Sequence, residues 1–190
     1  MSELPRFLRL IIPLVVLVVV FTIAGVVVMF SGWIDVSALK PHFVLTKWVL
    51  ETTMEHSVER RARGIRKPPA YPPIIRPHTF QHFSRMCGTC HGGLGKKPSE
   101  IGKGLRPRPP DLVKAAQGMP VEEIFWIVRN GIRMTGMPAF AVTHSDEELW
   151  EVVALVHALL DLKPAEYRNL VENHTGNMKT DPPSGAGSSH

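Results

Sequence analysis

The chain opens on an apolar segment that is long enough to cross a membrane. Residues 10–30 form an uncharged run of 21 residues, rich in Val, Leu and Ile. A helix rises about 1.5 Å per residue, so the run spans roughly 30 Å, the thickness of the hydrocarbon core of a bilayer. We therefore expect a transmembrane helix at residues 10–31.

A cleaved signal peptide is the alternative to a permanent anchor. Residues 36–38 (Val-Ser-Ala) resemble a cleavage site, although they lie some distance beyond the apolar run. The apolar region of a signal peptide usually has about 7 to 15 residues, fewer than this one, so length favours an uncleaved signal anchor. Arg6 and Arg9 precede the run, which predicts a cytoplasmic tail at residues 1–9 and places the later residues outside the cytoplasm.

A second helical pattern and a proline-rich segment follow, together covering residues 32–77. Leu50, Met54 and Val58 approximate one apolar stripe in a helix expected at residues 42–64. This amphipathic helix lies on the membrane surface, against a partner, or on the domain that follows, and the pattern leaves these options open. The prolines of residues 67–77 predict an extended, semi-rigid spacer.

Helical periodicity continues through a domain expected at residues 78–165, and no strand pattern interrupts it. Residues 120–131 form a short helix, in which Trp126 either lines a cavity or belongs to the core. Ser145 and Glu148 have the spacing of a capping box before an apolar stripe, which predicts a final helix to residue 160. The composition beyond it predicts a flexible C-terminal tail at residues 166–190. The expected fold class is all-α.

Charge is concentrated between the anchor and this domain. Residues 40–76 hold eight Lys or Arg and three Glu, an excess of five positive charges. This excess equals the net charge of +5 of the whole chain. The chain shows no nucleic-acid recognition motif, and export makes such a partner a poor explanation. Anionic lipid headgroups or an acidic partner subunit fit the charge better.

The two cysteines of the chain belong to one motif that indicates a cofactor. Cys87, Cys90 and His91 read Cys-x-x-Cys-His, the spacing at which two thiols bind haem covalently and the next residue ligates its iron. A thioredoxin-like pair would need a βαβ pattern, and a zinc site would need a second ligand pair; the sequence offers neither. The motif predicts one haem c, attached outside the cytoplasm, where bacteria perform this attachment.

A methionine loop supplies the candidate for a second iron ligand. Met137 lies between Gly136 and Pro138, a combination that gives a rigid turn able to present a thioether. Met134 is the rival, and both could instead fill gaps in the core. The turn favours Met137.

At these residues the chain resembles a class I cytochrome c. More narrowly, residues 78–160 are similar to the haem modules of cbb3-type oxidase subunit III, as found in membrane-anchored monohaem cytochromes. The resemblance implies a small all-α domain of three to five helices around the haem. It also implies that the Pro110 carbonyl orients His91, that Met137 is the distal ligand, and that Phe83 packs on the last helix near Val152 and Leu155.

The expected function is single-electron transfer by a His/Met-ligated haem in a single-pass protein of the bacterial inner membrane, with its haem domain in the periplasm. The partners would be a quinol-oxidising complex, a terminal oxidase or a dehydrogenase. A haem subunit fixed in a larger respiratory or dehydrogenase complex is the alternative; a haem enzyme or sensor is a further one. No catalytic constellation is present in the sequence, and the other eight histidines are expected at the surface or in packing.

Overall fold

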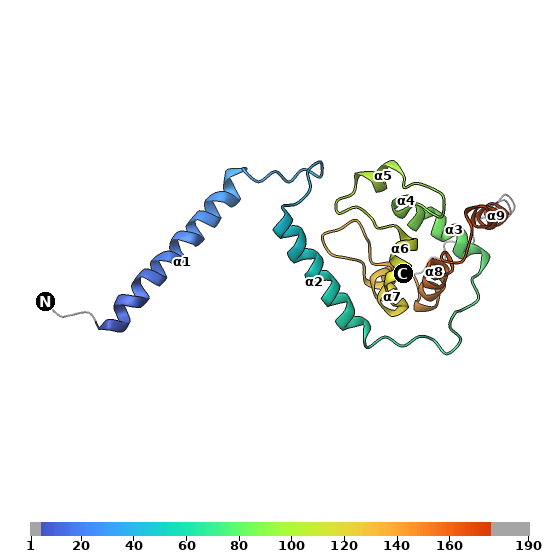
Figure 1. The fold of residues 1–190 in the computed structure, drawn as a ribbon, viewed down its shortest axis with the longest axis horizontal. Helices are drawn as coiled ribbons and strands as arrows, with labels where there is room; N and C mark the ends of the chain where they lie inside the picture. Colours follow the sequence, from blue (N-terminus) through green and yellow to red (C-terminus); the bar gives the residue numbers. More distant parts are fainter. Residues whose placement is uncertain (1–4, 176–190) are drawn as a thin grey trace, which may run out of the picture. The chain divides into compact units, whose positions relative to one another are not determined.

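The computed structural model describes residues 5–175, which divide into two compact units within residues 1–37 and 38–190. Helices are the regular elements of this part of the chain, and its one bridge joins Gly93 and Lys96 (Figure 1). The expected all-α class is confirmed.

The first unit is a long apolar helix. Helix α1 covers Arg6–Ser31, and its stretch Arg9–Ser31 is long and apolar enough to cross a membrane. Its Val and Leu side chains are exposed over the whole length, as expected of a surface meant for lipid. Gly32 ends the helix in a left-handed conformation with φ of 70°, which glycine adopts without a Cβ clash.

The second unit consists of short helices around one core. Its elements are α2 (Val44–Ala62), α3 (Pro77–Arg85), α4 (Cys87–His91), α5 (Glu100–Gly104), α6 (Leu112–Gly118), α7 (Val121–Asn130), the 3-10 turn η1 (Phe140–Val142), α8 (Asp146–Ala158) and α9 (Pro164–Thr175).

Helix α8 is the centre of the core. It packs on α3, α6, α7 and η1, and Leu149, Val153 and Leu155 are at most 1% exposed. The helix begins with the predicted capping box, because the Ser145 hydroxyl accepts from the Glu148 backbone N–H and the Glu148 carboxylate accepts from that of Ser145.

The second predicted helix packs on the domain with only one of its halves. Helix α2 is somewhat shorter than the expected 42–64, and its C-terminal half lies on α7, where Val58 and Ala62 are buried (Figure 1). The guanidinium of Arg61 lies 5.9 Å from the centre of the Trp126 ring, within the range of a cation–π contact. The N-terminal half of α2 is exposed along its length.

The proline-rich segment is not the spacer that its composition predicts. Tyr71 meets the edge of Trp150 at a ring-centroid distance of 5.4 Å, and Lys67 Nζ lies 3.3 Å from a carboxylate oxygen of Glu122. Closely spaced prolines do favour an extended chain, but the aromatic and aliphatic side chains between them provide area to bury. The segment therefore lies along the domain instead of holding it at a distance.

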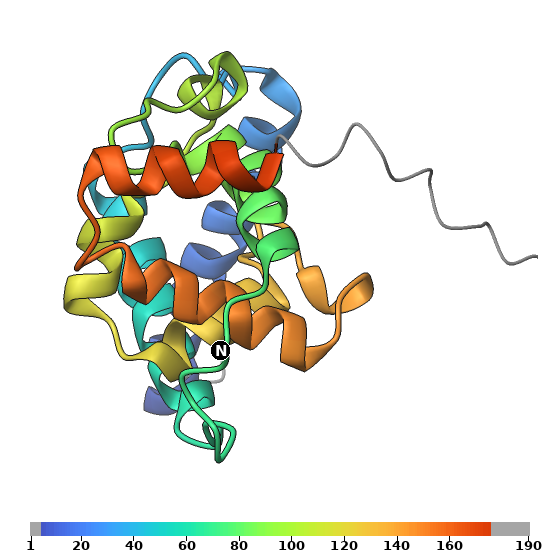
Figure 2. The same ribbon diagram turned by 90° about the vertical axis from the view of Figure 1, so that its right-hand side faces the viewer.

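The expected flexible tail from residue 166 is also wrong as far as residue 175. Helix α9 packs on α3, and Figure 2 shows it running across that helix. Tyr167 is only 5% exposed and points its ring at Phe83. Tyr167 anchors this helix together with half-buried Leu170 and Val171, and composition does not reveal these contacts. The rest of the expected tail, residues 176–190, lies outside the described residues.

Candidate functional site

The Cys-x-x-Cys-His motif forms a helix of its own, α4, directly after α3. Cys87 and Cys90 are three positions apart, so they lie on one side of this helix, and His91 is its last residue. Gly92 then turns the chain with φ of 78°. A Cβ there would collide with the carbonyl oxygen of Lys96, so glycine is needed both for the turn and for the close approach.

Helix α5 and the residue before it pack against the Cys-x-x-Cys-His motif. Gly102 lies so close to Cys90 that a Cβ on it would be 2.9 Å from the Cys90 Cα. The Ser99 hydroxyl donates to the Thr89 carbonyl at 2.6 Å, and the Ser99 backbone N–H donates to the same oxygen at 3.1 Å. These contacts hold the two cysteines in position.

A backbone carbonyl fixes the ring of His91. Its Nδ1 lies 2.9 Å from the Pro110 carbonyl oxygen. A carbonyl only accepts, so Nδ1 carries the proton and the lone pair of Nε2 is left for a ligand. The next residue, Asp111, caps α6 by accepting from the backbone N–H of Val113 at 2.9 Å, which holds the chain at Pro110 in place.

The methionine loop is closed by its own hydrogen bonds. The Ile132 N–H donates to the Met137 carbonyl at 3.2 Å, the Met137 N–H donates to the Thr135 hydroxyl at 3.1 Å, and that hydroxyl donates to the Ile132 carbonyl at 2.7 Å. A Cβ on Gly131 would lie 2.7 Å from the Met137 carbonyl oxygen, so the loop closes tightly.

The two methionines of this loop occupy different places. Met137 is half-buried and packs against the core, whereas Met134 is 88% exposed at the loop tip with φ of 63°. A Cβ on Gly136 would lie 2.7 Å from Cδ2 of Leu105, so the methionine loop contacts the segment between α5 and α6.

The residues present fit haem c. They comprise two thiols on one side of a helix, an imidazole with a fixed Nδ1 proton, and a half-buried thioether, a soft donor suited to haem iron. Burial raises the pKa of the Cys87 thiol to about 12, so without haem this sulfur is a neutral group packed on the core.

Comparison with known families points to the same cofactor. Residues 78–156 match the family described as cytochrome C oxidase, cbb3-type, subunit III. This segment is a cytochrome c domain. It carries covalently attached haem c, which contains iron. Cys87 and Cys90 are the only cysteines of the chain. No match was found among curated proteins or among solved structures.

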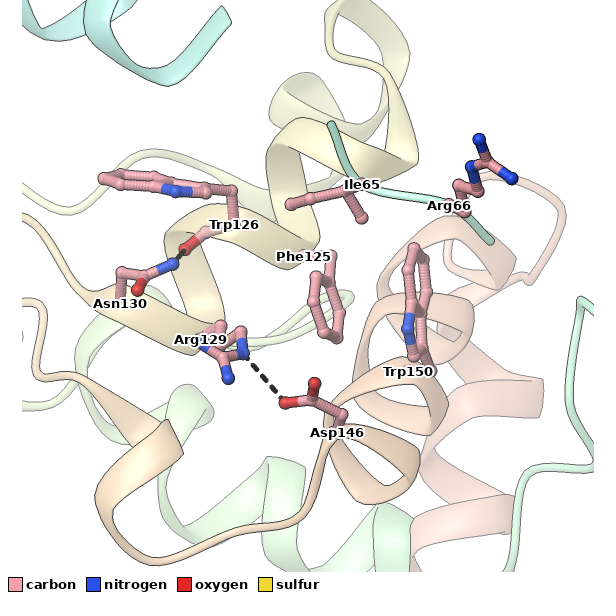
Figure 3. Close-up of a pocket in the computed structure, with 8 residues that line it drawn as sticks. All are labelled: Ile65, Arg66, Phe125, Trp126, Arg129, Asn130, Asp146 and Trp150. Carbon is pink, nitrogen blue, oxygen red and sulfur yellow. Dashed lines mark hydrogen bonds and ion pairs between the residues drawn. The ribbon is translucent and has the colours of Figure 1, made fainter. Parts of the chain in front are cut away.

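A surface cavity of about 340 Å³ lies on the cytochrome c domain beside α7 (Figure 3). Phe125 and Trp150 stack in its wall with ring centroids 4.1 Å apart, and Arg129 Nε donates to an Asp146 carboxylate oxygen at 2.8 Å. Trp126 is half-buried here, next to α2. Of the roles considered for Trp126, ordinary core does not describe this half-buried position.

Sequence patterns missed a buried carboxylate that joins α8 to the start of α3. Glu151 is 6% exposed and accepts from Arg76 Nε at 2.6 Å and from the Thr79 hydroxyl at 2.6 Å. Burial alone would raise the pKa of Glu151, but hydrogen bonds from Arg76 and Thr79 outweigh it and lower the pKa. The only signal in the sequence is a charged residue among the apolar positions of α8.

A second missed pair links α3 to the chain after the methionine loop. The Nε2 atoms of His82 and His144 are 2.9 Å apart, so one ring donates and the other accepts. Burial, then the neighbouring His144, lowers the pKa of His82. His82 is one of the histidines expected at the surface or in packing, and its partner is another histidine 62 residues away.

Proposed function

We propose that this protein is a membrane-anchored c-type cytochrome that carries single electrons between a donor and an acceptor at the membrane. Cys87 and Cys90 would form the thioether bonds to haem, and His91 and Met137 would ligate its iron. The observation that carries the proposal is the pairing of a cytochrome c domain with a half-buried, loop-bound Met137.

The protein's part in the chemistry is to hold the ligands. The Pro110 carbonyl keeps the proton of His91 on Nδ1 and orients the ring, and the same bond increases the basicity of Nε2. The hydrogen bonds around Thr135 fix the backbone at Met137, whose thioether would be the second ligand of the iron. When bound, haem supplies a one-electron couple.

Occupation of both axial positions separates an electron carrier from a haem enzyme. Oxygen and peroxide chemistry needs an open or displaceable position on the iron, and the rigid loop around Met137 opposes displacement. We therefore take the protein to be a carrier and not an enzyme or sensor.

The proposed cellular location rests on helix α1. We place residues 1–9 in the cytoplasm, α1 in the bacterial inner membrane, and the cytochrome c domain in the periplasm. The partners would be a quinol-oxidising complex, a terminal oxidase or a dehydrogenase, together with membrane lipid. A haem subunit fixed in a larger complex is the second candidate, and the exposed apolar half of α2 is the observation that favours it.

Two measurements on the detergent-solubilised protein test the proposal. A redox titration should follow a one-electron Nernst curve, and the ferrous protein should not bind carbon monoxide because Met137 holds the distal position. Rapid binding of carbon monoxide by the unmodified protein would show an accessible iron and favour the enzyme or sensor. Purification in mild detergent distinguishes the remaining candidates, because a fixed subunit would bring stoichiometric partners and a free carrier would not.

A further inference from the structure

The first half of α2 presents large apolar side chains that the cytochrome c domain does not cover. Phe43, Val44, Leu45 and Trp48 are each more than 60% exposed, and Val49 is 45% exposed. We call these five residues the apolar end of α2. On the same helix Val58 and Ala62, which face α7, are 2% and 4% exposed.

The two halves of α2 therefore differ in the kind of side chain that they expose. In the second half, the exposed positions are mostly charged, among them Glu55, Glu59 and Arg60. In the first half they are apolar, and helical geometry puts Leu45, Trp48 and Val49 on one side. Contiguous exposed apolar patches of this kind are rare on soluble surfaces and indicate an interaction site.

The connection to α1 limits what can cover this surface. Helix α1 ends at Ser31 and α2 begins at Val44, so residues 32–43 are the 12 that join them. Fully extended, they reach at most roughly 40 Å. The apolar end of α2 therefore stays within about one bilayer thickness of the point where α1 leaves the membrane.

The side chains of this region suit the zone between lipid tails and water. The joining residues add exposed Trp33 and Leu39. Tryptophan concentrates at membrane interfaces, where its apolar ring and polar N–H are both satisfied. Lys40 and Lys47 are basic, and Lys47 Nζ lies 3.7 Å from a carboxylate oxygen of exposed Glu51. The long side chains of these lysines can also reach anionic headgroups.

We propose that the apolar end of α2 inserts into the outer headgroup layer of the membrane that α1 crosses. A bilayer tethered by 12 residues is always within reach, so this contact needs no second protein. Because the other half of α2 packs on α7, the helix fixes the cytochrome c domain close to the membrane surface. The inference rests on the proposed membrane anchor.

Depth-dependent fluorescence quenching in vesicles tests this. In the haem-loaded full chain both native cysteines are occupied, so Leu45→Cys adds a single site for an environment-sensitive fluorophore. Comparison sites are Ile74→Cys, in the same unit and 89% exposed against 70% for Leu45, and Val19→Cys at the middle of α1. The proteins are reconstituted at low density into phosphatidylcholine–phosphatidylglycerol vesicles and quenched by nitroxide-bearing lipid or by aqueous iodide.

The label at residue 45 should be quenched several-fold more by nitroxide lipid, and several-fold less by iodide, than the label at residue 74. Adding Val44→Gln and Trp48→Gln should reduce the lipid quenching several-fold. The matched pair Ile101→Gln and Val142→Gln, exposed elsewhere on the same unit, should leave it unchanged.

The other outcomes overturn the inference in distinguishable ways. If iodide quenches the label at residue 45 while nitroxide lipid quenches the label at residue 19, insertion of α2 is refuted but the membrane anchor is not. Iodide quenching at residue 19 would refute the anchor itself. Shielding of residue 45 from both quenchers would show that protein covers the surface, and loss of that shielding on dilution would identify a second copy.

Discussion

The rings of Phe83 on α3 and Tyr167 on α9 meet edge to face, with centroids 6.4 Å apart and planes at 85°. Phe83 is fully buried in the same core cluster as Val152 and Leu155, its expected neighbours, but its aromatic partner comes from the helix after them. Burial and the nearby Cys87 raise the pKa of Tyr167 to about 12, so its phenol is neutral at physiological pH. The tyrosine ring also lies under Gly93, where a Cβ would be 3.1 Å from its hydroxyl oxygen. Tyr167 thus connects α9 to both α3 and the segment after the haem motif.

Replacing this tyrosine should destabilise the domain. We expect Tyr167→Ala to lower the free energy of unfolding by about 2–4 kcal/mol, because it removes a buried ring and leaves a cavity. Tyr167→Phe keeps the ring and should cost less than about 1 kcal/mol. Urea denaturation of the haem-loaded protein measures both. A Tyr167→Ala protein as stable as the parent would show that α9 does not contribute to the core.

The choice between Met137 and Met134 can be read from the ferric spectrum. Met137→Ala should abolish the sulfur-to-iron charge-transfer band, because the half-buried thioether is the proposed ligand. Met134→Leu should keep the band, since its side chain is at the exposed loop tip. Loss of the band only in the Met134 variant would reverse the assignment.

The anchor should remain attached to the mature protein. We expect N-terminal sequencing to begin at Met1 or Ser2, and the protein to stay with membranes after a high-salt wash. Salt screens charge but does not weaken the burial of apolar surface. A mature chain beginning at Leu39 would instead identify a cleaved signal peptide.

Basic residues beside the haem motif should guide the redox partner. Lys96, Lys97 and Lys103 are exposed in the segment between His91 and Pro110, whose hydrogen bond holds the iron ligand. Replacing all three with Gln should slow electron transfer to an acidic partner, most strongly at low salt, because charge complementarity mainly raises the encounter rate. The haem potential should hardly change.

The matched control for that variant is the replacement of exposed Arg60, Lys114 and Lys163 with Gln, which alters net charge by the same amount elsewhere. Stopped-flow kinetics over a range of ionic strength compares the two. Equal rates and equal salt dependence in both triple variants would mean that the lysines beside the motif serve solubility only.

The stability of the domain should depend on the ionisation of Glu151. Its pKa is lower in the folded protein than the unfolded value of about 4.3. A lowered carboxyl pKa gives stability that is present above the unfolded pKa and is lost as the pH falls through the folded pKa. Glu151→Gln should therefore reduce the free energy of unfolding by about 1–3 kcal/mol at pH 7 and progressively less below about pH 4.

Denaturation at several pH values tests this, with Glu147→Gln as the control. Glu147 is exposed on the same helix, so its replacement changes charge without removing a buried contact. A loss at Glu151→Gln that does not vary with pH would show that the carboxylate acts by shape alone.

Local patterns in the sequence determined much of this protein. The uncharged run gave α1, the spacing of Ser145 and Glu148 gave the start of α8, and the Cys-x-x-Cys-His motif gave the haem domain that the family comparison confirmed. These features succeed because each depends on residues within a few positions of one another, where helical geometry and covalent chemistry act directly.

Only the tertiary structure decided which distant residues meet. Glu151 pairs with Arg76 across 75 positions, Phe83 contacts Tyr167, and Tyr71 of the proline-rich segment contacts Trp150. Each of these side chains has an unremarkable local context, and its burial depends on a partner that periodicity cannot identify. The same reason explains α2: its stripe predicted one buried face, but only packing on α7 decided which half is covered and which half stays exposed.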